Sequence, residues 1–114
     1  MSVRPPSNLG SSSVSDVLFD ALGQEILAEK ASALGRAGEK AEAALARLDA
    51  HAGAAADGGA APGHDSQRQV LLKEAADAVY AFFIQRELCG LRRHDAVIRD
   101  LGIPREVLVR LGAK

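Results

Sequence analysis

The sequence predicts an all-α fold, in which two long antiparallel helices form a hairpin and two short helices follow at the C-terminus. Apolar residues recur in steps of three and four over residues 16–51 and 66–91, which is the period of an amphipathic helix. Alanine and leucine dominate the apolar residues, and both favour helices. No alternating β-branched run reaches five residues. The 114 residues are enough for one domain.

The first helix is predicted over residues 16–51, where no proline interrupts the pattern. Residues 1–14 are predicted to be a flexible leader, because Pro5 and Pro6 lack backbone donors and the serines that follow have nothing to bury. The single helical domain is then residues 15–114. A bend near Gly35 is compatible with the pattern, since glycine weakens a helix interior.

An apolar seam runs along the second half of this helix, in alternating steps of four and three residues. Its members are Leu27, Ala31, Leu34, Gly38, Ala41, Leu45 and Leu48. Such a heptad seam packs against another helix, and its small central residues allow a close approach. The partner is either the next helix of the chain or a second copy. We favour a homodimer, because the first helix is about ten residues longer than the second.

A Gly/Ala-rich linker is predicted over residues 53–65, where no apolar period is visible. The second helix should then run over residues 66–91, with Asp65 or Ser66 as its capping residue. Its residues 75–84 are apolar on most sides, which indicates a central helix with more than one neighbour.

Two short helices are predicted for the remainder, over residues 93–101 and 104–111. Gly102 fits the left-handed position that ends a helix, and Pro104 fits the first turn of the next helix.

The corner at residues 96–111 resembles the turn of a helix-turn-helix, which makes DNA binding the alternative function. Arg105, Glu106 and Arg110 would face the groove. Residues 86–114 carry seven basic and four acidic side chains, which is the right local sign. We favour the simpler interpretation, a Gly-Ile-Pro corner packed on the hairpin.

A second polar cluster lies at the end of the second predicted helix. Its members are Arg86, Glu87, Arg92, Arg93 and His94. With Arg105 and Arg110 they are the candidates for a nucleic-acid or polar site, and His94 could serve as a base oriented by a carboxylate. An ordinary charged helix end is the interpretation we favour, because arginine near a helix C-terminus also complements the helix dipole.

Several functional classes find no support in the sequence. The net charge of −1 argues against a dedicated nucleic-acid binder. His51, His64 and His94 lack the spacing of metal ligands, and Cys89 is the only cysteine. We therefore predict no metal, cofactor or enzymatic activity. No signal segment and no apolar run of membrane-spanning length is visible, so we expect a cytoplasmic protein that does not associate with a membrane.

Two stretches, EILAEKASALGRAG at residues 25–38 and FFIQRELCGLRRHDAVIRDLGIPREVLVRLG at residues 82–112, resemble a small all-helical proteobacterial family of unknown function. The resemblance implies a compact helical domain and brings no activity, cofactor or site. From the residues, we predict a non-enzymatic protein that self-associates and acts through contacts with other proteins.

Overall fold

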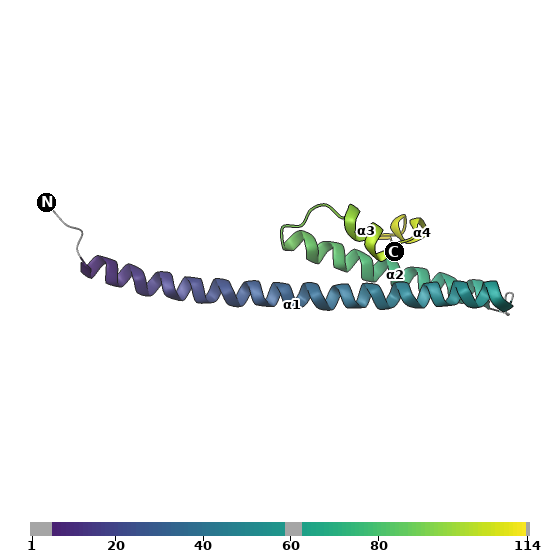
Figure 1. The fold of residues 1–114 in the computed structure, drawn as a ribbon, viewed down its shortest axis with the longest axis horizontal. Helices are drawn as coiled ribbons and strands as arrows, with labels where there is room; N and C mark the ends of the chain where they lie inside the picture. The colour runs from purple at the N-terminus through teal and green to yellow at the C-terminus, as the bar shows by residue number, and fades with distance from the viewer. Residues whose placement is uncertain (1–5, 59–62, 114) are drawn as a thin grey trace.

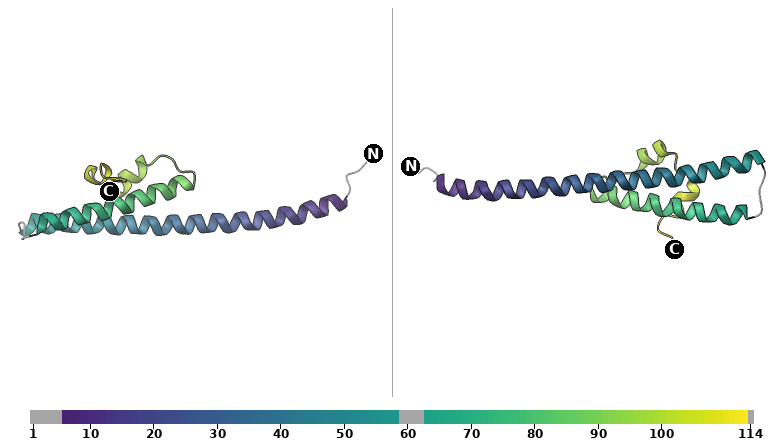
Figure 2. Two further views of the ribbon diagram at one scale, coloured as in Figure 1. Left: turned by 180° about the vertical axis from the view of Figure 1, so that it is seen from behind. Right: turned by 90° about the horizontal axis from the view of Figure 1, so that it is seen from below.

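The computed structural model describes residues 6–58 and 63–113, with side chains for residues 14–54 and 63–113. Four helices follow one another: α1 (Pro6–Gly58), α2 (His64–Leu88), α3 (Asp95–Leu101) and α4 (Arg105–Leu108). No strand occurs in these residues, so the predicted all-α fold is confirmed. The molecule is a rod of 85 × 25 × 20 Å, in which α2 folds back along one end of α1 (Figures 1 and 2). Helix α4 packs against α2.

Helix α1 is longer at both ends than the apolar pattern predicts. It begins at Pro6 rather than near Asp16, so residues 6–14 of the predicted leader are helical, and residues 1–5 lie outside the described part. Proline is well suited to the first helical turn, where its missing N–H would have no partner anyway. The helix continues through Gly35 without a break.

The predicted linker at residues 53–65 is shorter in the structure. Residues 53–58 continue α1 and α2 already begins at His64, while residues 59–62 lie outside the described part. Alanine is the strongest helix former, and it carries α1 beyond the end of the apolar seam. The cap of α2 also differs from the prediction: neither Asp65 nor Ser66 caps it, because Gly63 takes the N-cap position in a left-handed conformation (φ 83°).

The C-terminal helices lie where the sequence predicts them and are shorter. Helix α2 ends at Leu88 rather than Leu91, because Gly90 turns the chain with φ 88°. Gly102 ends α3 in the left-handed conformation, as predicted. Pro104 is the N-cap of α4 rather than part of its first turn, and α4 ends at Leu108, short of the predicted residue 111.

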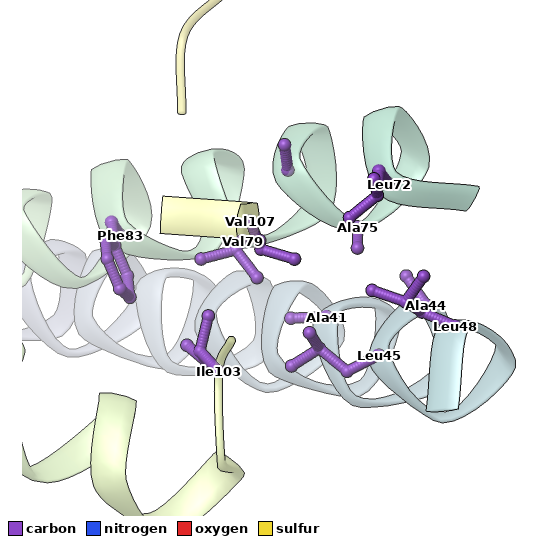
Figure 3. Packing of buried hydrophobic residues seen from close by; sticks show 11 residues of the cluster. Ala41, Ala44, Leu45, Leu48, Leu72, Ala75, Val79, Phe83, Ile103 and Val107 are labelled. Atoms are coloured by element: carbon purple, nitrogen blue, oxygen red, sulfur yellow. The ribbon is translucent and has the colours of Figure 1, made fainter. Parts of the chain in front are cut away.

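The core lies between the C-terminal half of α1, most of α2, and the segment around α4 (Figure 3). Fully buried side chains come from all three parts, and the largest are Leu72, Val79 and Val107. Gly38 lies against the ring of Phe82, where a Cβ atom would be 3.2 Å from the ring Cε1. Ile103 and Val107 enter the same core from the C-terminal segment (Figure 3). Helix α2 is therefore the central helix that its apolar sequence indicated.

Candidate functional site

The N-terminal part of α1 has no partner within the described chain. The Cys89 thiol lies 3.9 Å from the carbonyl oxygen of Lys30, which marks the level at which α2 ends alongside α1. We call residues 6–30 of α1 the overhang. It extends about 37 Å beyond that level as a single helix, and Figures 1 and 2 show it projecting alone.

The overhang exposes large apolar side chains along its length. Seven of them are between 54% and 72% exposed: Val14, Val17, Leu18, Phe19, Leu22, Ile26 and Leu27. Single exposed hydrophobic residues are ordinary, but a group of this size is typical of interaction surfaces.

The predicted seam is divided between this overhang and the hairpin. Ala41, Leu45 and Leu48 are buried against α2, and Gly38 is half-buried under Phe82. Leu34 is half-buried, whereas Leu27 and Ala31 are exposed. The C-terminal part of the seam thus serves the hairpin, and only its N-terminal part remains open to a partner.

A shallow groove runs between residues 33–47 of α1 and residues 74–81 of α2. Two adjoining hollows, of about 250 Å³ and 420 Å³, share Lys40 and Ala78. Their apolar lining consists only of alanines: Ala33, Ala37, Ala43, Ala44, Ala78 and Ala81. Basic side chains from α1 stand on one rim, namely Arg36, Lys40 and Arg47, and the acidic Glu74 and Asp77 of α2 stand on the other. Arg47 lies 3.9 Å from Glu74 across the groove. We call this feature the alanine groove.

Three residues of the predicted polar cluster do meet. His94 Nδ1 accepts a hydrogen bond from Arg86 Nε at 3.1 Å, and His94 Nε2 lies 3.0 Å from a carboxylate oxygen of Glu87. The imidazole also stacks on Phe83, with ring centroids 4.1 Å apart and an interplanar angle of 4°. This pattern requires the neutral tautomer with its proton on Nε2. Both ring nitrogens are therefore engaged, and the cluster fastens the loop after α2 to that helix.

Arg92 and Arg93 lie in the loop between α2 and α3, beside the His94 cluster. Both side chains are exposed, and the backbone carbonyl of Arg93 accepts a hydrogen bond from Arg86 at 2.8 Å. The arginine pair therefore belongs to the polar loop that leads to α3, and it lines none of the hollows described above.

Residues 96–111, for which the sequence suggested DNA binding as the alternative function, pack on the hairpin. Helix α4 has only four residues, and its Val107 is fully buried. Glu106 accepts two hydrogen bonds from Arg68 at 2.6 and 2.7 Å, while Arg110 donates to the backbone carbonyl of Glu106 at 2.9 Å. Arg105 remains exposed. A recognition helix places its side chains in a DNA groove, whereas in α4 Val107 packs in the core and Glu106 pairs with Arg68 of α2.

The Arg68–Glu106 ion pair shifts both of its members. The hydrogen bonds from Arg68 lower the pKa of the Glu106 carboxyl below its ordinary value, and the same bonds raise the pKa of the Arg68 guanidinium. The pair joins the first turns of α2 to α4, and 38 residues separate the two side chains in the sequence.

A pair of histidines that the sequence gave no reason to connect lies at the closed end of the hairpin. His51 and His64 stack with centroids 4.0 Å apart at an interplanar angle of 15°. Both ring nitrogens of His51 are shielded from solvent and have no hydrogen-bond partner among the described residues. This contact could not be predicted from the sequence, because only the folding of the hairpin brings the end of α1 and the start of α2 together.

Metal and membrane sites find no counterpart in the residues described. No group of three or more His, Cys, Asp or Glu side chains there is arranged to hold a metal ion. Within those same residues, none of the helices combines the length and the apolar character that a bilayer crossing needs.

The fold and its surfaces define a small helical-hairpin protein with an exposed helical overhang. The chain belongs to a family of unknown function (DUF6665), which it matches over residues 1–114. No curated protein and no solved structure matches the chain.

Proposed function

We propose that this protein acts without catalysis, by self-association through the overhang of α1 and by contacts with other proteins. The observation that carries the proposal is the row of seven large apolar side chains on residues 14–27, more than half exposed along a helix that leaves its own hairpin.

The energetic argument concerns both the side chains and the helix. Full burial of one Val, Leu, Ile or Phe side chain contributes roughly 1.5–3 kcal/mol. A helix without tertiary contacts is only marginally stable in water, and the overhang also contains Gly23. A partner that covers this surface supplies both the burial and the packing that hold the overhang helical.

A second copy is the partner proposed, because the chain itself carries a surface that fits. The alanine groove offers room for large side chains, and its α1 rim is basic. The overhang carries Asp16, Asp20, Glu25 and Glu29 against Lys30 as its one basic residue from position 14 onward. An acidic helix with large apolar side chains thus meets the basic α1 side of a groove whose apolar lining is small.

The non-catalytic part of the proposal rests on the polar cluster. His94 is the residue best placed to act as a base, and its two nitrogens bond to Arg86 and Glu87 in a way that fixes the loop. We place the protein in the cytoplasm, on the sequence evidence given above.

Light scattering over a concentration series tests self-association. We expect twice the monomer mass of 11.9 kDa for the wild-type chain, and the monomer mass for Leu22→Asp. Leu22 is more than half exposed, so this change spares the hairpin core. Ala28→Asp, on another side of the overhang, is the matched control and should remain dimeric. A wild-type monomer at every concentration, or a Leu22→Asp protein with the wild-type mass, would overturn the proposal.

A further inference from the structure

We infer that two copies pair antiparallel along one side of α1, so that the overhang of each copy lies in the alanine groove of the other. This inference rests on the self-association proposed above and specifies its geometry. It assigns the alanine groove a role as the receptor for the overhang, and it identifies Glu25 and Lys40 as residues that determine the specificity of pairing.

The first supporting observation is that the two surfaces share one side of a single helix. Residues on that side recur in steps of three or four along α1: Leu18, Leu22, Ile26, Glu29, Ala33, Arg36, Lys40, Ala44 and Arg47. The first three are large, apolar and exposed. Those from Ala33 onward are the small and basic residues of the alanine groove. The character of this side thus changes from large and acidic to small and basic near residue 31.

Such a side is complementary to itself when it is turned end over end. In an antiparallel pair related by a two-fold axis near residue 31, Leu22 of one copy lies level with Lys40 of the other, and Leu18 lies level with Ala44. Each overhang then fills the partner's groove, and both grooves are filled at once. An interface of this kind closes on itself and leaves no surface for further growth.

Side-chain size supports the same arrangement. The groove is open because its walls are alanines from both helices, and its two hollows together follow α1 from Ala33 to Arg47. Large side chains inserted between small ones give the interlocking on which helix packing depends. The crossing point also lies among small residues, with Ala31 and Ala33 on α1.

Charge supports it as well. Glu25 of one copy comes level with the region between Arg36 and Lys40 of the other. Lys40 forms no ion pair within the described chain. Arg36 donates to the Ser32 hydroxyl at 2.7 Å and lies 3.4 Å from Glu29 of its own helix, so Lys40 is the freer of the two cations. Two-fold symmetry makes each cross-pair occur twice, so a single charge reversal changes the interface at two places. The acidic overhang also argues against an anionic lipid surface as the alternative occupant.

Charge reversal provides the first test. Glu25→Lys and Lys40→Glu should each raise the dimer dissociation constant about tenfold, because two attractive pairs become repulsive in each. The double variant Glu25→Lys/Lys40→Glu should return to within about threefold of the wild-type value. Glu42→Lys, an exposed position on another side of α1, is the matched control and should leave the constant unchanged. A double variant whose dissociation constant is raised by both single effects together would overturn the arrangement.

Cysteine cross-linking provides the second test, in a Cys89→Ser background. A mixture of the Leu22→Cys and Lys40→Cys proteins should form a mixed disulfide, while neither protein should cross-link alone, since a disulfide requires Cα atoms about 5.5–6 Å apart. Cross-linking of the Leu22→Cys protein with itself would indicate overhangs paired with each other. That result, in a chain of dimer mass, overturns the groove while self-association stands. A monomeric mass throughout overturns both.

Discussion

Gly38 on α1 lies directly against the aromatic ring of Phe82 on α2. A Cβ atom at position 38 would lie 3.2 Å from Cε1 of the Phe82 ring, whereas Gly35, one turn earlier, has nothing within 4 Å. The two glycines belong to the same helix and differ only in what faces them. Substitutions at Gly35 therefore report the low helix propensity of glycine alone, whereas substitutions at Gly38 also report its packing against Phe82.

Gly35→Ala should stabilise the protein by up to about 1 kcal/mol, because alanine is the better helix former and no neighbour resists it. Gly38→Ala should gain less, since the Phe82 ring must move by a few tenths of an ångström. Replacement by leucine should enlarge the difference, with Gly38→Leu clearly destabilised and Gly35→Leu near wild type. Urea unfolding of the four variants measures this, and equal effects at both positions would contradict the packing described.

Acidification should weaken the attachment of α4 to α2. Arg68 lowers the pKa of Glu106 in the folded chain, so the unfolded chain takes up a proton at Glu106 at higher pH than the folded chain does. The stability from this pair is present above the pKa of an unfolded glutamate, and it is lost as the pH falls through the lowered pKa of the folded state. Arg68→Met should therefore show a shallower loss of stability with acid than the wild type.

The urea midpoint measured from neutral pH down to about pH 3 gives this comparison. Lys73→Met is the control, because Lys73 pairs with Asp77 at 3.2 Å between two exposed side chains of one helix. An Arg68→Met curve parallel to that of the wild type would show that the ion pair contributes nothing to the acid response.

The His94 cluster should act as a structural clasp. His94→Phe keeps the stack on Phe83 and removes both hydrogen bonds, so we expect a loss of about 1 kcal/mol. His94→Ala removes the stack as well and should cost more. Hydrogen exchange of the amides in residues 89–94 should rise in both variants, while exchange in α1 stays unchanged. Wild-type protection of this loop in His94→Ala would refute the clasp.

Val107 should be the residue that anchors the C-terminal segment. It is fully buried, whereas Val109, two residues later, is 65% exposed. Val107→Ala should cost about 2 kcal/mol through lost burial and the cavity left behind. Val109→Ala should lie within about 0.5 kcal/mol of the wild type. Thermal unfolding of both proteins tests the difference, and similar values would mean that α4 is not part of the core.

Local patterns were sufficient for the helices and for much of the core. The steps of four and three through Ala41, Leu45 and Leu48 predicted a packed seam, and these residues are buried. Gly102 predicted a helix end through its freedom to adopt a positive φ. The helix ends at residues 6 and 58 were missed, because alanine, serine and glycine there carry no apolar period from which a boundary can be read.

The candidate surfaces were harder to predict, because their members come from separate elements. The seam from Leu27 to Leu48 was one pattern in the sequence, yet α2 covers only its later part. The alanine groove was not predicted, because alanines in a sequence indicate helix propensity and do not identify a groove between two helices. The Arg68–Glu106 pair and the His51–His64 stack join residues whose sequence neighbours give no sign of each other.

The sequence by itself determined that the chain is helical, that a helix ends at Gly102 and which residues of each long helix are apolar. These properties follow from propensity and period, which act over a few residues. Only the tertiary structure decided how far α2 reaches along α1, and therefore which apolar side chains are satisfied within the chain and which remain exposed. That division depends on the relative lengths and register of two packed helices, a property that no local pattern contains.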